Sequence, residues 1–309
     1  MKKILFLVVA LFSLVFVSCD NKKYNVVTTT FVGYDAARAV LGDSSDIKML
    51  MKPGSDIHSY EPSATDIKSV LNAKVFIYIG GESDSEWVEK DILGNVKDKD
   101  IKIVNMFDVL EDNLILEEGE EDEYDEHVWT SPVNYIKIVD AVKDALIKTN
   151  LYDNTKLETN TTSYINKLKE VDKNIEAAVK MHEEKTIVVA DRFPLLYFVN
   201  EYDLDYASAL KGCSTDKDVP SSKIIELKNK AEDKKVNYIF IIELSDSRIA
   251  YTVVDQINND IKNNKYDGKK PEIKTFYSMQ NISKDDFNKN LTYVDFMNMN
   301  IELLKNLFD

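Results

Sequence analysis

A long stretch without glycine or proline divides this chain into two halves that share one pattern. Residues 154–185 place apolar side chains at helical spacing, which predicts a single long helix with one buried face. On both sides of this stretch, short apolar runs alternate with amphipathic segments. Such an alternation predicts βαβ units, in which successive strands join a parallel sheet. We therefore expect an α/β protein with two lobes of parallel sheet joined by one helix.

The expected strands and helices give each lobe its boundaries. Strands are expected at 25–31, 46–51, 74–80 and 101–107 in the first half, and at 186–191, 205–210, 236–244 and 271–278 in the second. Helices are expected at 34–42, 63–73, 82–93, 131–149, 194–204, 220–235, 247–259 and 290–308. We place the first lobe at residues 19–153, the connecting helix at 154–185 and the second lobe at 186–309.

The first residues have the composition of a secretion signal. Two lysines precede an apolar run from Ile4 to Val17, and Ser18 and Cys19 follow it. The run is shorter than the ~20 apolar residues that a membrane-spanning helix needs. The cysteine after this run resembles a bacterial lipobox, which implies that residues 1–18 are removed and that Cys19 carries a lipid. The alternative is an ordinary signal peptide with an incidental cysteine. With the lipid, the chain is expected at the extracytoplasmic face of the cell membrane.

The charge and cysteine content limit the partners of this chain. A formal net charge of −15 argues against nucleic acid, whose phosphates need a basic face, and is compatible with a cationic ligand. Once Cys19 is lipidated, Cys213 is the one remaining cysteine, so no disulfide can form within the chain. We expect a monomer that its lipid holds at the membrane.

Four residues that can bind a metal lie beside the ends of expected strands and helices. His58 follows the strand at 46–51, and His127 lies just before an expected helix. Asp191 and Glu243 come at the ends of two strands of the second half. Ligands of open α/β sheets bind beyond the carboxyl ends of the strands, which here means the cleft between the lobes. Two imidazoles with carboxylates suit Zn²⁺ or Mn²⁺.

Each of these side chains also has a purely structural interpretation. A histidine in a loop is more often a surface hydrogen-bonding residue than a metal ligand. Asp191 can pair with Arg192 or cap the helix that follows, and Glu243 can cap the helix after it. His182, whose neighbours are charged, is interpreted as a solvated residue of the long helix.

Residues 117–126 form an acidic run directly before His127. A run of like charges is usually a solvated and mobile segment. The functional alternative is a weak cation collector that raises the metal concentration near the cleft. Both interpretations place these carboxylates outside the primary coordination of the metal.

Two segments resemble those that bind the metal in a known family. GSDIHSYEPSATDI and EHVWTSPVNY are similar to the first two ligand segments of zinc and manganese solute-binding proteins of ABC importers, the cluster A-I family. YIGGESDSEWVE resembles the strand and turn between them. The resemblance covers nearly all of the chain after Cys19. It implies that His58 and His127 bind the metal, that an ABC permease receives it, and that no catalysis is involved.

The second half departs from the usual pattern of that family. Where the family has a histidine or glutamate after the first strand of this lobe, the chain has Asp191, within a segment that resembles a subgroup with DRFP and GCST motifs. The resemblance therefore implies Asp191 as the third ligand. At the place of the last family ligand the chain reads FYSMQN, in which Gln280 can offer an oxygen. Water, Glu243 or Gln280 are open as the fourth ligand, and a contribution from Cys213 is also open.

Two functions from other classes compete with metal transport. A surface interaction protein or adhesin can use the same lipid-anchored scaffold with a degenerate metal site. A metal-dependent hydrolase can use the same histidines and carboxylates, but the sequence shows no HExxH segment, no nucleophile motif and no further histidine as a general base. A stoichiometric bound ion without turnover supports transport, whereas the absence of an ion in the purified protein supports the interaction protein.

Overall fold

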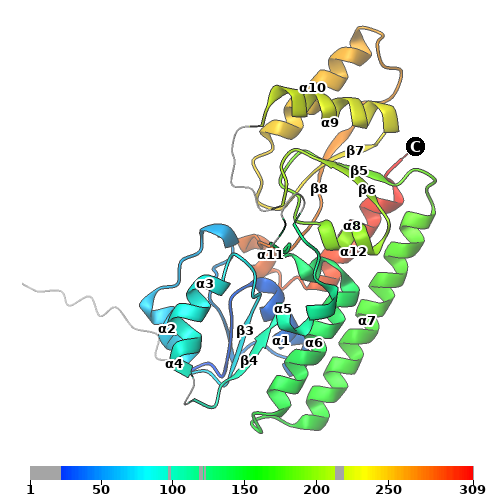
Figure 1. The fold of residues 1–309 in the computed structure, drawn as a ribbon. Coiled ribbons are helices and arrows are strands. Elements are labelled where there is room, and N and C mark those ends of the chain that lie inside the picture. The colour runs from blue at the N-terminus through cyan, green and yellow to red at the C-terminus, as the bar shows by residue number, and fades with distance from the viewer. Residues whose placement is uncertain (1–21, 97–98, 118–120, 122, 213–218, 309) are drawn as a thin grey trace, which may run out of the picture.

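Two four-stranded parallel sheets form the framework of the molecule (Figure 1). The computed structural model describes residues 22–96, 99–117, 121, 123–212 and 219–308. The first sheet has the order β2-β1-β3-β4 and the second has the order β6-β5-β7-β8, so both lobes share one topology. The strands are β1 (Val26–Thr28), β2 (Ile47–Met49), β3 (Val75–Tyr78), β4 (Lys102–Asn105), β5 (Thr186–Val189), β6 (Asp205–Ser208), β7 (Tyr238–Ile241) and β8 (Glu272–Thr275). The predicted fold class of two parallel α/β lobes is confirmed.

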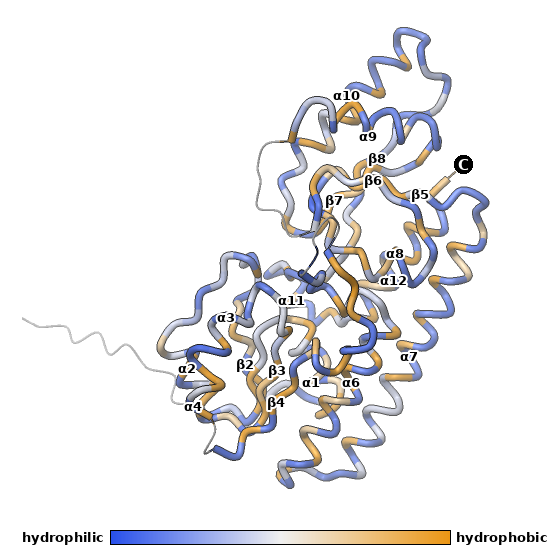
Figure 2. Tube along the Cα trace, viewed as in Figure 1, coloured by the Kyte–Doolittle hydropathy of each residue, from blue (hydrophilic) through white to orange (hydrophobic). Residues whose placement is uncertain are grey.

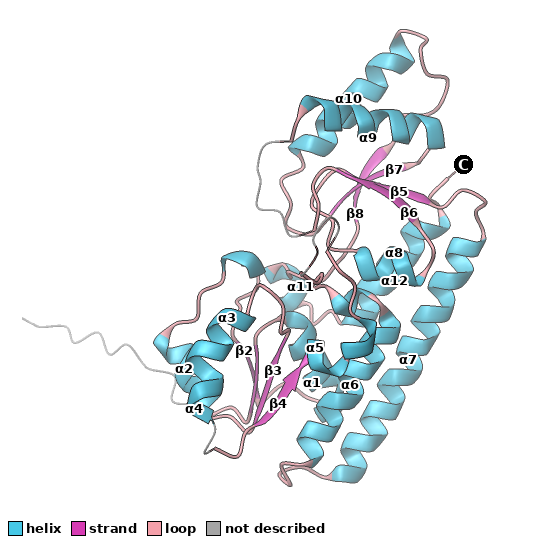
Figure 3. Ribbon diagram, in the orientation of Figure 1, coloured by secondary structure: helices cyan, strands magenta, loops and turns pink. Residues whose placement is uncertain are grey.

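Helices surround both sheets (Figure 3). In the first half they are α1 (Phe31–Leu41), α2 (Ala64–Leu71), α3 (Ser85–Trp87), α4 (Gly94–Val96), α5 (Met106–Val109) and α6 (Pro132–Ile147). In the second half they are α8 (Leu196–Glu201), α9 (Ser221–Lys234), α10 (Arg248–Lys262), α11 (Lys284–Asn288) and α12 (Tyr293–Lys305). Short 3-10 turns occupy Ile57–Ser59, Glu111–Asn113 and Val128–Thr130. Among the described residues, no helix combines the length and the apolar composition that crossing a membrane requires.

Local capping explains where two of these helices begin. Ser63 and Asp66 form a reciprocal capping box at the start of α2. Ser131 accepts a hydrogen bond from the backbone amide of Asn134, and Pro132 takes the first position of α6. Both helix starts agree with the sequence prediction.

The single helix expected at 82–93 is instead a series of short pieces. It begins only at Ser85, because the Asp84 carboxylate accepts the backbone amides of Ile79 and Gly80 and thereby forms a turn after β3. A π-helical turn, Val88–Leu93, then joins α3 to α4. Burial raises the pKa of this buried Asp84 to about 7.

The connecting helix α7 (Asn154–Lys180) runs along the side of both lobes (Figure 1). Figure 2 shows hydrophobic and hydrophilic residues alternating along it, as an amphipathic strut requires. The helix ends before residue 185, so His182 lies beyond it. The His182 ring packs edge-on against Phe308, and its Nε2 lies 2.8 Å from the carbonyl oxygen of Leu304. The interpretation of His182 as a solvated helix residue is therefore wrong.

The C-terminal helix α12 packs against the first lobe rather than only against the second. The Tyr293 ring stacks on Tyr135 at a centroid distance of 3.9 Å, and its hydroxyl donates to the carbonyl oxygen of Trp129 at 2.8 Å. The Phe296 ring meets Phe31 of α1 edge-on. One apolar core therefore runs from the first sheet through α6, α7 and α12 to β5. Since packed cores resist deformation, this continuity limits the relative motion of the lobes.

Candidate metal centre

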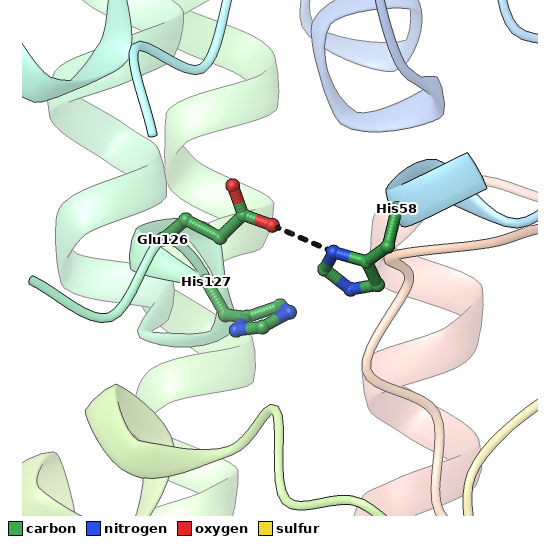
Figure 4. Close-up of side chains that lie close together, drawn as sticks. All are labelled: His58, Glu126 and His127. Atoms are coloured by element: carbon green, nitrogen blue, oxygen red, sulfur yellow. Dashed lines mark ion pairs between the residues drawn. The ribbon is translucent and has the colours of Figure 1, made fainter. Parts of the chain in front are cut away.

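Three side chains converge at the boundary of the two lobes. His58, Glu126 and His127 each offer one ligand atom, and these atoms all lie within 4.8 Å of one another. In Figure 4 the Glu126 carboxylate and the His127 ring approach His58 from the opposite loop. His58 belongs to the loop after β2, whereas Glu126 and His127 immediately precede the turn that leads into α6. The structure thus brings together the two histidines that the sequence singled out, and adds Glu126.

The position of His58 is set by a short 3-10 turn. Asp56 caps this turn, because its Oδ1 accepts the backbone amide of His58 at 2.9 Å. The Nδ1 atom of His58 lies 3.4 Å from Oε1 of Glu126, and its buried Nε2 has no hydrogen-bond partner among the described residues. Burial lowers the pKa of His58, while the nearby Glu126 carboxylate acts in the opposite direction. The structure therefore favours the neutral imidazole, which is the form that binds a metal.

A carboxylate and an amide hold the ring of the fully buried His127. Oδ1 of Asp125 lies 3.3 Å from Nδ1 of His127 and also accepts the backbone amide of His127 at 2.8 Å. On the other side of the ring, Nε2 lies 3.0 Å from Oε1 of Gln280. A carboxylate on one nitrogen orients the ring and makes the other nitrogen the better metal ligand. Asp125 thus directs Nε2 of His127 toward Gln280 and the shared site.

Glu126 is a candidate metal ligand that the sequence did not single out. It was assigned to the solvated acidic run 117–126, but its side chain is only 2% exposed. The backbone amide of Ser83 donates to its Oε2 at 2.9 Å, which leaves Oε1 facing His58. Asp125 is buried as well, so the end of the acidic run belongs to the site. The position of Glu126 directly before His127 was the feature of the sequence that could have indicated its place in the site.

Gln280 is the second-lobe residue at the centre. It lies in the turn after β8, is almost fully buried, and places its amide oxygen beside His127. Its Nε2 has no hydrogen-bond partner among the described residues. Of the two described side chains that the sequence left open for the fourth position, Glu243 and Gln280, it is Gln280 that contacts a histidine of the site.

Glu243 holds the turn that carries Gln280. Its Oε2 accepts the backbone amide of Ser278 at 2.9 Å. Its Oε1 accepts the Ser278 hydroxyl at 2.8 Å and the backbone amide of Asn281 at 3.1 Å. Burial raises the pKa of Glu243. The carboxylate therefore organises the turn after β8, rather than capping the helix after β7 or joining the group of three.

Asp191 lies at the end of β5 but outside the group of three. Its Oδ1 accepts the backbone amide of Arg192 at 2.8 Å, and its Oδ2 accepts the backbone amide of Ile242 at 3.2 Å. The Arg192 guanidinium does not fold back on Asp191 and instead pairs with Asp56 of the first lobe at 3.1 Å. Burial raises the pKa of Asp191. Cys19 and Cys213, the two cysteines of interest, lie outside the described residues.

The spacing of one pair of side chains in the group suits a tetrahedral cation. Two ligands at ~2.0–2.1 Å from a tetrahedral Zn²⁺ are about 3.3 Å apart. The separation between Nδ1 of His58 and Oε1 of Glu126 is 3.4 Å, close to this value. Two imidazoles and one carboxylate also match the nitrogen and oxygen ligands that Zn²⁺ accepts.

A comparison with family models then decides the relationship of the chain. The family described as "ZnuA: Zinc-uptake complex component A periplasmic" matches residues 26–307. The chain belongs to this family. The match spans both lobes and α7, and it agrees with the resemblance to metal solute-binding proteins that the two histidine segments indicated.

The chain is also similar in sequence to individual zinc-binding proteins. The zinc-binding lipoprotein AdcA of Streptococcus pneumoniae strain R6 is 29% identical over 331 residues, which covers 100% of this chain and 62% of AdcA. The high-affinity zinc uptake system protein ZnuA of Bacillus subtilis strain 168 is 28% identical, over 93% of this chain and 89% of ZnuA. The chain thus spans less than two thirds of the length of AdcA.

Two solved structures share the fold of this chain. The metal-dependent lipoprotein YcdH of Bacillus subtilis superposes with a TM-score of 0.76 at 25% identity, covering 93% of this chain and 99% of YcdH. The Zn(II)-bound ZnuA-like domain of Streptococcus pneumoniae AdcA gives a TM-score of 0.73 at 25% identity, with 93% and 100% covered.

Proposed function

We propose that this chain is an extracytoplasmic solute-binding protein that captures Zn²⁺ and delivers it to the permease of an ABC importer. The convergence of His58, Glu126 and His127 at the lobe boundary is the observation that carries this proposal. Membership of a family described as a component of a zinc-uptake complex supports it. The names of AdcA and ZnuA, which refer to zinc, favour Zn²⁺ over Mn²⁺ as the cargo. The two imidazoles favour the same metal.

The proposed ligands are His58, Glu126 and His127, with the amide oxygen of Gln280 as the fourth. This set replaces Asp191, whose carboxylate oxygens accept backbone amides instead. The Glu126 carboxylate compensates part of the charge of the ion, and the buried site excludes competing water. Binding and release of the ion need no bond to be made or broken in a substrate, so we propose no enzymatic activity.

The proposed location follows from the first residues of the chain. Residues 1–18 serve as a signal peptide, and lipidation of Cys19 anchors a monomer at the outer face of the membrane, with the lobes at 19–153 and 186–309. The description of AdcA as a lipoprotein supports this proposal. We expect the parent protein in the membrane fraction and the Cys19→Ser variant in the medium. An unchanged distribution of the variant between membrane and medium would contradict lipidation.

Metal analysis of the purified protein tests the function itself. After removal of bound metal and titration with Zn²⁺ in a calorimeter, we expect one tight ion per chain. Metal-free and zinc-loaded protein are then incubated with ester and phosphoester substrates, and neither is expected to turn them over. Absence of a tight zinc ion, or hydrolysis that depends on zinc, would contradict the proposal.

The zinc affinity is expected to depend on pH in a way that His58 sets. Zn²⁺ binds the neutral imidazole, and burial lowers the pKa of His58 from its ordinary value of 6.5. The proton therefore competes with zinc at His58 only below this value, and the affinity falls as the pH falls through the lowered pKa. Competition calorimetry between about pH 5 and 8 measures this dependence. A zinc affinity that already falls above pH 6.5 would contradict this expectation.

A further inference from the structure

The second lobe holds the His58 loop, defined here as residues 52–59, through three contacts. The backbone amide of Gly54 donates to the carbonyl oxygen of Ile282 at 2.7 Å. The backbone amide of Ile57 donates to Oδ1 of Asn281 at 3.1 Å. The guanidinium of Arg192 pairs with Asp56 at 3.1 Å. The loop that carries one proposed ligand is therefore fastened to the turns that follow β8 and β5.

Asp56 connects this fastening directly to His58. One of its oxygens, Oδ1, accepts a hydrogen bond from the backbone amide of His58. The other, Oδ2, accepts a hydrogen bond from Nη2 of Arg192. The Arg192 side chain is 18% exposed and that of Asp56 is 39% exposed, so the pair is partly shielded from solvent. The Asp56 carboxylate thus links two parts of the molecule. One is the turn that carries His58, and the other is the Arg192 guanidinium of the second lobe.

The backbone around Arg192 is itself fixed from within the second lobe. Asp191 accepts the backbone amides of Arg192 and Ile242, which ties the end of β5 to the end of β7. Glu243, the next residue after Ile242, organises the turn that includes Asn281. Two of the three second-lobe partners of the His58 loop, Arg192 and Asn281, are consequently held by buried carboxylates of their own lobe.

We propose that Arg192 is a positioning residue that makes zinc affinity depend on the placement of the second lobe. This inference rests on the proposed function of the site. Arg192 holds Asp56, and through it the His58 turn, in the geometry that binds zinc. When the second lobe moves away, the ion pair and the Asn281 contact break together, and His58 loses its position. The second lobe then controls release of the ion although Gln280 is its sole proposed ligand and carries no charge.

Electrostatics and positioning predict opposite effects for the loss of Arg192. The guanidinium repels a nearby cation, and Arg192→Gln also leaves the Asp56 carboxylate unpaired and attractive to zinc. If only these electrostatic interactions mattered, Arg192→Gln would therefore bind zinc more tightly than the parent. Loss of positioning makes it bind more weakly. The sign of the change in affinity decides between the two.

A double-mutant cycle in the zinc-free full chain tests the inference. Arg192→Gln is combined with Asp56→Asn, which keeps an oxygen for the His58 amide but removes the charge. Arg248→Gln is the matched control, because Arg248 is an exposed arginine of the same lobe that pairs only with its neighbour Asp246 among the described residues. Calorimetry gives the zinc affinity, and stopped-flow transfer to a chelator gives the release rate.

We expect Arg192→Gln and Asp56→Asn each to weaken zinc binding about 10-fold, the lower end of the losses seen when a partner of a metal ligand is removed. The release rate should increase by about the same factor. The double variant should be no weaker than either single variant, since both break one interaction. Arg192→Lys should recover part of the loss, and Arg248→Gln should bind as the parent does.

Two results would overturn the inference while leaving the proposed function intact. One is tighter or unchanged zinc binding by Arg192→Gln when the parent binds one ion. The other is a double variant whose loss is the product of the single losses, which would show that the residues act independently. Failure of the parent itself to bind zinc would instead refute the proposed function.

Discussion

Replacing His127 by alanine is expected to abolish tight zinc binding, with a loss of more than about 100-fold. The ring is fully buried between Asp125 and Gln280, so no other side chain can take its place without rearrangement. Changes to outer partners of metal ligands already cost ~10–100-fold, and loss of a ligand should cost at least as much. His58→Ala should have an effect of the same order. Calorimetry with a competing chelator measures both variants.

His182→Ala provides the control for these two variants. It removes the third histidine of the chain. This histidine contacts Leu304 and Phe308 and is not part of the group formed by His58, Glu126 and His127. We expect parental zinc affinity and a reduced thermal stability from this control. Parental affinity in both His58→Ala and His127→Ala would show that the ion binds elsewhere.

Glu126→Gln is expected to weaken zinc binding by about 10–100-fold. The substitution keeps the size of the side chain and an oxygen that can accept the Ser83 amide, so the fold should be preserved. It removes the one negative charge among the proposed ligands. A neutral amide stabilises the ion less than a carboxylate in a buried site, where electrostatic interactions are strong.

Glu123→Gln is the matched control for Glu126→Gln. Glu123 belongs to the same acidic run, but it is exposed. If the run only collected cations, the two substitutions would have similar and small effects on the tight site. Equal affinity of both variants and the parent would remove Glu126 from the proposed ligands.

The fold was predictable because its determinants are local and periodic. Strand and helix patterns, the capping box at Ser63 and the proline at the start of α6 identify most elements from sequence. His58 and His127 were found for a related reason. Each lies in a loop beside an element that the sequence defines, and such loops gather at the binding edge of parallel sheets.

The features that the sequence did not reveal depend on contacts between distant residues. Burial of Glu126 results from its contact with Ser83, which a run of like charges does not indicate. The pairing of Arg192 with Asp56 joins residues of different lobes, whereas the sequence suggested a partner next to Arg192. The packing of Tyr293 on Tyr135 likewise places α12 against the first lobe.

The continuous core limits how the proposed zinc ion could be released. Since α7 and α12 both pack against the first lobe, a wide opening of the lobes would expose apolar side chains that are now buried. Small displacements of the turns after β5 and β8 avoid this cost. Such displacements are sufficient to break the contacts of Arg192 and Asn281 with the His58 loop.

The most direct test of the metal centre is anomalous diffraction from crystals of the zinc-loaded protein. Data collected on both sides of the zinc absorption edge locate the ion independently of any assumption about its ligands. We expect one strong anomalous peak at ~2.0–2.1 Å from a ring nitrogen of His58 and of His127 and from a carboxylate oxygen of Glu126. A strong peak at another place in the chain, with none between these three side chains, would contradict the account.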